Sequence, residues 1–293
     1  MALLHWLAAR RGHATLIACH LNHGLRGNDS GQDAALVRRL AKKLGVECEV
    51  EKIDTQCLAE QSGESIETAA RRARHEFFAR MAEKHGTALV YLAHHAEDQA
   101  ETVLAHLCRG AGLNGLSGMK SEQALDNGLH LRRPLLSWRR GEINDYIRRH
   151  KLPFRDDASN DSDLHRRNRL RHEVLPLLGE IFDRDVSGTI ASLAEHVVQD
   201  EAALQAWLDQ VWQDLAPMQE DGSLKVTEAL KKLPQGLLRR LLRRWLRDEL
   251  HIPDLGHAEI EAACELLEEL EPAKANLPGD RHLRRKAKRL WVE

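Results

Sequence analysis

The 293 residues are 42% hydrophobic and carry a formal net charge of -2 at pH 7, which suits one large domain or two ordinary ones with buried cores. No apolar run approaches the length of a membrane span, and the first residues lack the apolar region of a signal peptide, so we expect a cytoplasmic protein without membrane contact. The five cysteines include no C-x-x-C pair, which argues against a disulfide framework and against a zinc or iron–sulfur site.

The charge is unevenly distributed. Residues 132–171 contain twelve Lys and Arg against six Asp and Glu. A second basic cluster closes the chain at Arg281, Arg284, Arg285, Lys286, Lys288 and Arg289. Such clusters are typical of proteins that bind a phosphate-rich partner, although either one alone is also explained by a solvated surface.

The first part of the chain alternates strand and helix patterns. We expect a helix up to Arg11, a buried strand at residues 14–19 and a polar loop at 20–30. A helix at 30–44, a second strand at 46–53 and a long helix at 64–84 follow. This alternation predicts a parallel sheet covered by helices on both faces, with right-handed connections.

The third strand pattern, residues 88–92, leads directly into A-H-H-A-E-D-Q-A-E-T at residues 93–102. The motif places two histidines and three acidic residues where a strand ends and a helix begins. In an open parallel sheet this edge binds ligands. The alternative is that the acids only cap the helix, since Asp and Glu are favourable in a first turn.

A glycine-rich stretch follows at residues 110–118. It lacks the order and setting of a dinucleotide fingerprint, and a mobile loop over a site or a tight path between elements explains it equally well. A helix is expected at residues 138–150, and an acidic turn segment at 156–163 leads into the basic run 166–171.

The last third of the chain has helical patterns. Residues 185–215 predict a long amphipathic helix, residues 218–223 are the best linker candidate, and residues 237–246 combine an apolar face with a basic one. We therefore expect a catalytic domain at residues 1–180, a helical linker at 181–222 and a small helical domain at 223–293.

Several separated motifs resemble those of the tRNA(Ile)-lysidine synthases, in the order and spacing of that bacterial family. They are H-L-N-H-G-L-R (20–26), E-S-I-E-T-A-A-R-R-A-R (64–74), A-H-H-A-E-D-Q-A-E-T (93–102), R-G-A-G-L-N-G-L-S-G-M (109–119), R-R-P-L-L (132–136) and D-A-S-N-D-S-D-L-H-R-R-N-R-L-R (157–171). The closing helical segment resembles the family's tRNA-contacting domain.

The resemblance implies a doubly wound α/β fold of the N-type ATP pyrophosphatase (adenine nucleotide alpha hydrolase-like) kind. It also implies a ligase that uses ATP and Mg²⁺ to adenylate the wobble cytidine of the isoleucine tRNA with a CAU anticodon. The ε-amino group of free L-lysine then displaces AMP to give lysidine. The expected partners are this tRNA and lysine, and a homodimer is left open. Cationic groups suit such chemistry because phosphate charge must be neutralised.

The resemblance also implies roles for single residues. Catalytic roles fall to His95 and Asp98, with Asp98 also a candidate for Mg²⁺, and to Arg71 and Arg74, for which a pair of surface cations is the alternative. The loop residues expected beside the nucleotide are His20, Asn22 and His23. Substrate or tRNA contacts are expected from Glu97, Arg167, Asn168 and Arg171, and from Arg284, Arg285 and Lys288 of the second basic cluster.

The sequence departs from the family pattern in two ways. Glu97 stands where many members have Asp, which changes reach but not charge. The signature S-G-G-x-D-S, whose backbone amides bind ATP phosphates, is absent, and Met1–His5 resembles what normally follows it. We therefore expect these 293 residues to lack the first strand, to be poorly stable and to fail to turn over ATP, and we expect the activity of a form that extends upstream through S-G-G-x-D-S.

Two other functions stay open. A tRNA-binding protein without catalysis would follow from the absent phosphate loop. A 2-thiocytidine-forming relative shares the fold and the ATP chemistry, but it is disfavoured because such enzymes resemble one another in cysteine pairs that are absent here.

Overall fold

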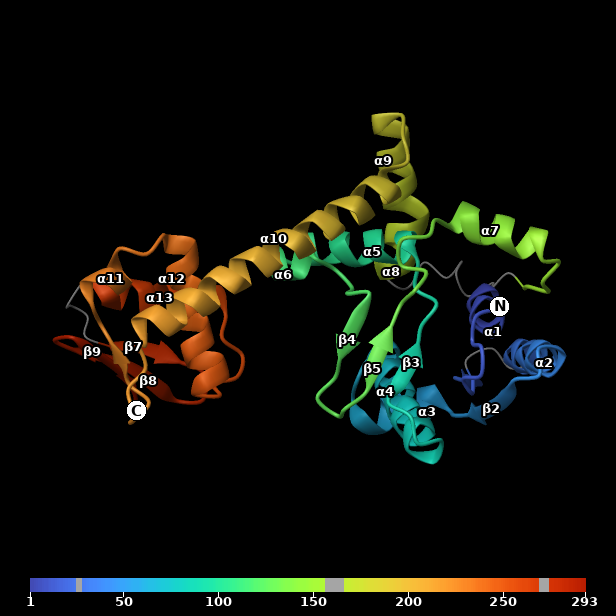
Figure 1. Ribbon diagram of the computed structural model, residues 1–293, viewed down its shortest axis with the longest axis horizontal. Coiled ribbons are helices and arrows are strands. Elements are labelled where there is room, and N and C mark those ends of the chain that lie inside the picture. Colours follow the sequence, from blue (N-terminus) through green and yellow to red (C-terminus); the bar gives the residue numbers. More distant parts are fainter. Residues whose placement is uncertain (25–27, 156–165, 269–273) are drawn as a thin grey trace. The chain divides into compact units, whose positions relative to one another are not determined.

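The computed structural model describes residues 1–24, 28–155, 166–268 and 274–293 (Figure 1). The expected acidic turn at 156–163 and the first part of the D-A-S-N run lie outside the described residues. The chain divides into two compact units, Met1–Val198 and Gln199–Glu293, whereas the sequence placed the boundaries near residues 180 and 222. The division falls within one long helix, α10 (Val186–Leu215).

The first unit alternates helices and strands, as its sequence predicts. In chain order the elements are α1 (Ala2–Ala8), β1 (Ile17–Asn22), α2 (Asn28–Lys43), β2 (Glu47–Lys52), α3 (Thr55–Ser62), α4 (Ile66–Lys84), β3 (Leu89–Tyr91), α5 (Ala96–Leu107), α6 (Leu113–Leu116), β4 (Glu122–Ala124), β5 (His130–Arg132), α7 (Arg140–Arg149), α8 (Arg166–Arg169), the π-helix η2 (Leu170–Val174), α9 (Leu175–Phe182) and the start of α10.

The strands of this unit form two sheets. β1 and β2 pair in parallel, from Ile17 opposite Glu47 to Asn22 opposite Lys52. In the second sheet, of order β3-β5-β4, β3 and β5 are parallel and β4 is antiparallel. The predicted parallel sheet is therefore confirmed. The antiparallel edge strand β4 was not predicted, because a strand of three residues is too short to show a clear pattern. Helix α4 contacts both β1 and β3.

Helix α4 shows how the local sequence positions this unit. The Ser65 hydroxyl accepts a hydrogen bond from Thr68 N at 3.2 Å and caps the helix. Ala69, Ala73 and Phe77 recur every four residues and are buried, with Phe77 fully so. This stripe turns one side of α4 toward the unit's interior and leaves Arg71 exposed.

The second unit combines helices with an antiparallel sheet. Besides the end of α10 it contains β6 (Leu224–Lys225), α11 (Glu228–Lys231), α12 (Gln235–Arg244), the π-helix η3 (Trp245–Glu249), α13 (His257–Glu268), β7 (Lys274–Leu277), β8 (Arg281–Lys286) and β9 (Arg289–Val292). The strand order is β6-β9-β8-β7. The helices were expected; the sheet was not, because β8 reads R-H-L-R-R-K and its charges hide the alternation.

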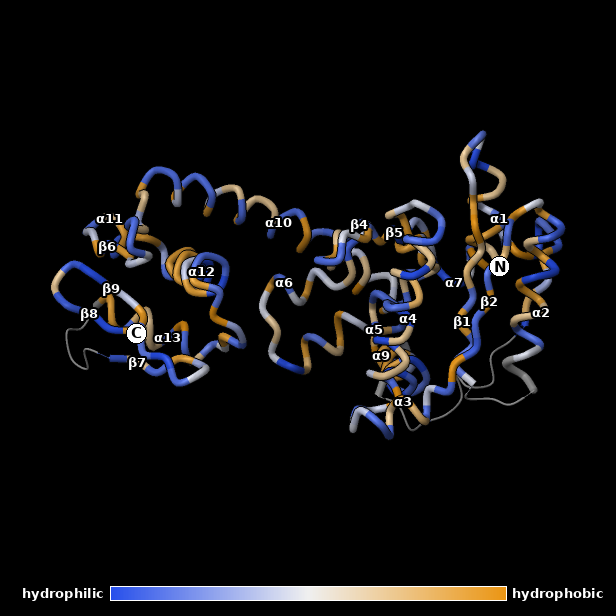
Figure 2. Tube along the Cα trace, turned by 90° about the horizontal axis from the view of Figure 1, so that it is seen from below, coloured by the Kyte–Doolittle hydropathy of each residue, from blue (hydrophilic) through white to orange (hydrophobic). Residues whose placement is uncertain are grey.

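Helix α12 forms the centre of this unit's core. Leu237, Leu238, Leu241 and Leu242 are buried on one side, and Figure 2 shows the hydrophobic and hydrophilic sides of the helix. Trp245 follows, fully buried, and its Nε1 donates to Gly222 O at 3.0 Å. Residues 218–223, the expected linker, are therefore part of the packed unit.

No helix in the described part of the chain combines the length and the apolar character that a membrane-spanning segment needs.

Candidate active site

The site is built at the carboxyl ends of β3 and β5. Leu92 N donates to Arg132 O at 2.8 Å, which continues the parallel pairing, and Ala96 N donates to Trp138 O at 2.9 Å. His94 and His95 follow β3, and Arg133 follows β5, so the ends of adjacent parallel strands bring them together. Such an edge is where an open α/β sheet binds ligands.

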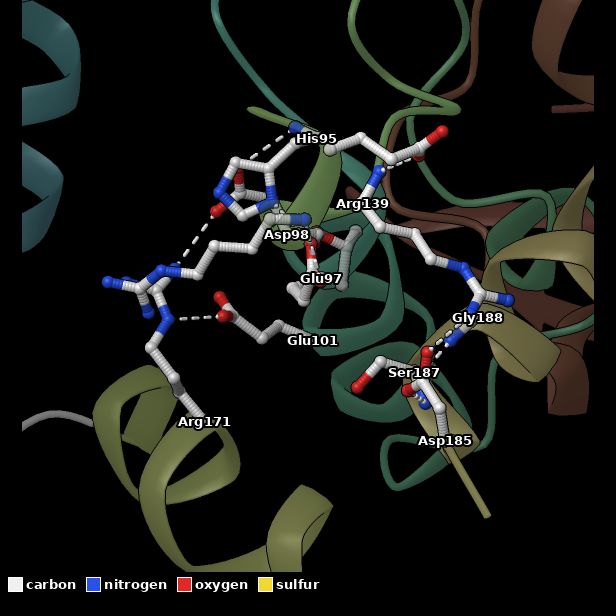
Figure 3. A network of polar contacts seen from close by, with 12 residues as sticks. His95, Glu97, Asp98, Glu101, Arg139, Arg171, Asp185, Ser187 and Gly188 are labelled. Carbon is white, nitrogen blue, oxygen red and sulfur yellow. Dashed lines mark hydrogen bonds and ion pairs between the residues drawn. The ribbon is translucent and has the colours of Figure 1, made fainter. Parts of the chain in front are cut away.

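Two carboxylates on α5 and two arginines form a four-membered ion cluster (Figure 3). Arg167 donates from Nε to Glu101 at 2.6 Å and from a terminal nitrogen to Asp98 at 3.1 Å. Arg171 repeats the arrangement, at 2.6 Å to Glu101 and 2.9 Å to Asp98. The i, i+3 spacing of the acids and the i, i+4 spacing of the arginines place each pair on one side of its helix.

This cluster is largely removed from solvent. The side chain of Glu101 is 1% exposed and that of Asp98 is 12% exposed, whereas the side chain of Arg167 is 43% exposed. A buried carboxylate is tolerated only when it is paired and hydrogen-bonded, and each acid here has two guanidinium partners. Arg171 lies in the π-helix η2, an irregular helical form that often occurs at functional sites.

His95 and Glu97 form a second group at the start of α5. His95 Nδ1 lies 2.8 Å from Glu97 Oε2, and His95 Nε2 lies 3.5 Å from Asp98 Oδ2. Arg140 N donates to both oxygens of Glu97, at 2.9 and 3.1 Å, so Glu97 caps α7. Burial would raise the pKa of Glu97, but the hydrogen bonds from His95 and from Arg140 N outweigh it and lower the pKa.

The preceding residue, Arg139, ties α7 to the start of α10. Its guanidinium lies 3.0 Å from Asp185 Oδ2. Asp185 in turn accepts from Ser187 N at 3.0 Å and from Gly188 N at 3.3 Å (Figure 3). A Cβ at Gly188 would meet the Arg139 guanidinium, which would have to shift to make room.

Three further arginines lie near the cluster without an acidic partner among the described residues. Arg71 is exposed, Arg74 is half-buried and Arg133 is buried. Burial, followed by the nearby charges of Arg71 and Arg167, lowers the pKa of Arg74. Since isolated buried cations are costly, this excess of guanidinium groups favours an anionic ligand.

His94 contacts one of these arginines. Arg133 Nε donates to His94 Nδ1 at 3.2 Å. Burial lowers the pKa of His94 to about 4, with Asp98 opposing the shift and Arg133, Arg167 and Arg74 adding to it. His94, Glu101 and Arg133 were not singled out from the sequence, although all three lie inside the motifs quoted above, and only the fold shows that they converge.

The loop after β1 lies beside the start of α3. His20 and Asn22, which were expected in the loop, lie in β1. Asn22 is buried and its Oδ1 accepts from Gly24 N at 2.9 Å. In the loop itself, His23 Nδ1 lies 3.2 Å from Thr55 Oγ1. Burial, then Arg74 and His20, lower the pKa of His23, which places this loop within electrostatic reach of the arginines. Contacts of His20, Asn22 and His23 with a nucleotide stay predictions, as does the role of half-buried Asn168 on α8.

The second basic cluster is only partly available to a partner. Arg285 is buried, and its guanidinium donates to Leu266 O and, at 3.4 Å, to Ala287 O. Arg284 donates to Glu293 at 2.7 Å. The tRNA-contacting roles of Arg284 and Arg285 stay predictions. Lys286 and Lys288 are exposed, with no ion pair among the described residues.

The predicted magnesium site at Asp98 does not fit this donor set. Asp98 Oδ1 accepts from both Arg167 and Arg171, and Oδ2 accepts from His95 N at 3.0 Å. A hard dication needs oxygen ligands with free lone pairs, and here two guanidinium groups stand where it would bind. Asp98 instead holds these cations in place.

Comparisons with known proteins agree with this architecture. Residues 1–178 match the family of the PP-loop domain, which binds ATP, and residues 226–291 match the TilS substrate binding domain. This chain is similar to the structure of the U34-tRNA thiolase NcsA from Methanococcus maripaludis, which was solved with its 4Fe-4S cluster. The TM-score is 0.54 at 18% sequence identity, and the match covers 68% of this chain and 67% of that one. This likeness shows the fold alone.

Relatives named tRNA(Ile)-lysidine synthase are similar over most of the chain. That of Geobacter sulfurreducens is 38% identical over 230 residues, covering 78% of this chain and 48% of its own length. Those of Bacillus licheniformis and Bacillus cereus (strain ATCC 10987) are 34% and 31% identical, covering 82% and 96% of this chain and 50% and 60% of their own. The chain thus spans about half the length of the curated relatives that it matches. It belongs to the PP-loop family in the form that also carries a TilS substrate binding domain, the family of the tRNA(Ile)-lysidine synthases.

Proposed function

We propose that this protein joins L-lysine to the wobble cytidine of the isoleucine tRNA with a CAU anticodon, at the expense of ATP. The observation that carries the proposal is the juxtaposition of the Asp98–Glu101–Arg167–Arg171 cluster with Arg71 and Arg74 at the carboxyl ends of the parallel strands. A tRNA is also the substrate class of the relatives' printed names.

In the first step, the cytidine O2 attacks the α-phosphorus of ATP and pyrophosphate leaves. Bound ATP supplies the adenylyl group and the driving force. Arg74 and Arg71, which have no acidic partner among the described residues, would bind phosphate oxygens and offset the charge that develops on them. Asp98 and Glu101 keep Arg167 and Arg171 directed at the same place.

In the second step, the ε-nitrogen of lysine attacks C2 of the cytidine, and AMP leaves with the electrons of the C2–O bond. The ε-ammonium group must first lose a proton. His95 Nε2, which lies 3.5 Å from Asp98 Oδ2, is the group proposed to accept it. No step uses Mg²⁺, which stays a prediction, as does a homodimer.

The test is incorporation of radiolabelled lysine into CAU-anticodon tRNA(Ile), with ATP required. Asp98→Asn should reduce incorporation by at least about a hundredfold, because the neutral amide cannot hold two guanidinium groups in place. Asp126→Asn, in the turn between β4 and β5, is the matched control. Sulfur incorporation in place of lysine would contradict the proposal.

The second candidate is tRNA binding without catalysis. The exposed Lys286 and Lys288, which have no ion pair among the described residues, support it. The same assay separates the two candidates. Tight tRNA binding with no lysine incorporation at any ATP concentration would establish the second.

A further inference from the structure

The two adjacent histidines at the start of α5 contact groups of opposite hydrogen-bonding character. Arg133 Nε lies 3.2 Å from His94 Nδ1, and a guanidinium group has only donors, so His94 Nδ1 must accept. Glu97 Oε2 lies 2.8 Å from His95 Nδ1, and an ionised carboxylate only accepts, so His95 Nδ1 must donate. A neutral His94 therefore carries its hydrogen on Nε2, whereas His95 carries one on Nδ1.

Both partners are themselves held in place. Arg133 is 6% exposed, and its terminal nitrogens donate to Lys120 O at 2.7 Å and to Gln123 Oε1 at 3.2 Å. Glu97 accepts from Arg140 N with both oxygens. Neither side chain can turn away without losing a second contact, so each ring is oriented by a fixed group.

The backbone explains how neighbours in sequence reach different partners. His95 is extended, with φ -133° and ψ -177°, and successive side chains of an extended segment point in opposite directions. His94 turns toward Arg133 after β5, whereas His95 turns toward Glu97 in the first turn of α5.

We infer that Arg133 and Glu97 are positioning residues that fix His94 and His95 in opposite tautomers. This inference rests on the proposed function for its chemical meaning. His94 Nε2–H, which has no hydrogen-bond partner among the described residues, donates to an oxygen of the nucleotide or cytidine. His95 exchanges its proton at Nε2, next to Asp98, where the lysine ammonium is deprotonated.

The charged groups that face His94 come from every neighbouring element. They are Asp98 of α5, Arg133 after β5, Arg167 of α8 and Arg74 of α4. Burial is the main reason that the ring stays neutral, and the three cations among these four groups add to it against Asp98. A neutral ring with a fixed Nε2–H remains a donor throughout the neutral pH range.

The tautomers are measured directly on the 293-residue chain labelled with ¹⁵N-histidine. A long-range ¹H–¹⁵N correlation spectrum at pH 7.5 separates protonated from unprotonated ring nitrogens. His94→Asn and His95→Asn assign the two rings, and His13→Asn, at an exposed position, controls for general shifts. We expect Nδ1 unprotonated and Nε2 protonated in His94, and Nδ1 protonated in His95. The reverse pattern in either ring, or tautomer averaging, would overturn the inference.

Arg133→Lys tests the positioning role while keeping the positive charge. It should give His94 a mixture of tautomers and lower kcat for lysine incorporation by about 10- to 100-fold, as for other partners that orient an imidazole, with KM for tRNA within about twofold. Arg132→Lys is the matched control, because Arg132 pairs with Glu122 at the surface. Unchanged His94 signals in Arg133→Lys would overturn the role of Arg133.

Glu97→Gln tests the second ring, because the amide can donate to Nδ1 as well as accept from it. We expect its pH profile for kcat to shift and the His95 Nδ1 signal to lose its fixed protonation. Glu142→Gln is the control, since Glu142 also caps α7, through Arg139 N at 2.8 Å, without contacting His95. Equal spectra for Glu97→Gln and the wild type would contradict the inference. The spectra need no turnover, so fixed opposite tautomers without lysine incorporation would refute the proposed function alone.

Discussion

At the scale of single residues, the site depends on cations and anions that satisfy one another away from water. Glu101 is 1% exposed between Arg167 and Arg171, and its burial is tolerated only because both guanidinium groups bind it. The motif placed an acid at this position of a predicted helix, but its burial depends on arginines about 70 residues further along the chain.

Glu101→Gln should therefore lower the free energy of unfolding by about 3–5 kcal/mol, the cost of breaking a buried ion pair. Glu122→Gln removes a carboxylate that is 67% exposed and paired with Arg132, and it should cost less than about 1 kcal/mol. Urea denaturation of both variants provides the comparison. A Glu101→Gln variant as stable as Glu122→Gln would show that the ion cluster contributes little to stability.

The pKa of His94 predicts a pH dependence. Its folded-state pKa of about 4 lies below the ordinary value of 6.5, so the unfolded chain binds this proton first. Stability should fall as the pH drops from 6.5 toward 4, by up to about 3 kcal/mol from this group. In His94→Gln that contribution is removed, so the loss over the same window should be smaller. Parallel unfolding curves of variant and wild type against pH would contradict this.

At the scale of elements, the glycine-rich segment is a tight path and belongs to the packing of α5. Gln99 is 4% exposed, donates to Met119 O at 3.0 Å and accepts from Met119 N at 2.8 Å. The sequence left open whether this stretch is a mobile loop. Its contacts with α5 instead fix the connection between α5 and β4.

Gly118 is the position at which this packing requires glycine. Its φ is +62°, and a Cβ there would lie 2.7 Å from Gln99 Oε1. Gly128 has a similar φ of +82° but open space around its Cβ position. Gly118→Ala should lower the melting temperature more than Gly128→Ala, with about 1–3 kcal/mol for the backbone strain that both share and a further loss from the clash. Equal melting temperatures would mean that the Gln99 side chain moves away from the added Cβ without a loss of stability.

Some of these helices and strands could be predicted from the sequence, and others could not. Periodicity and caps located α4, α5 and the strands β1, β2 and β3, because their patterns are local and their turns carry Gly, Ser or Asp. The short strand β5 was not predicted. The sheet of the second unit was missed because β8 carries four cations among six residues. On α12 the sequence showed a basic face, but only the fold shows that Arg240 pairs with Glu201 and Arg244 with Asp209, which leaves this face less available to RNA than its composition indicates.

At the scale of the whole molecule, RNA binding should depend on exposed cations that form no ion pair with the described residues. Lys286 and Lys288, in and after β8, are exposed, whereas Arg284 and Arg285 are occupied. Lys286→Ala/Lys288→Ala should weaken tRNA binding and reduce the slope of log K against log salt by about 0.7–0.9 per lost phosphate contact. Lys231→Ala/Lys232→Ala, on and after α11, is the control with equal charge. An equal change in the salt slope for both double variants would indicate that net charge attracts the RNA, rather than Lys286 and Lys288 in and after β8.

We propose that one site adenylates a tRNA cytidine and then joins lysine to it. The most direct measurement supplies CAU-anticodon tRNA(Ile) with ATP labelled at the α-phosphorus and omits lysine. We predict that the label accumulates on the tRNA as AMP, and that added lysine releases it while lysidine forms at the wobble position. Wild type should do both, whereas Asp98→Asn should do neither at a comparable rate while still binding the tRNA. Label that never reaches the tRNA, or that lysine fails to release, would contradict the claim.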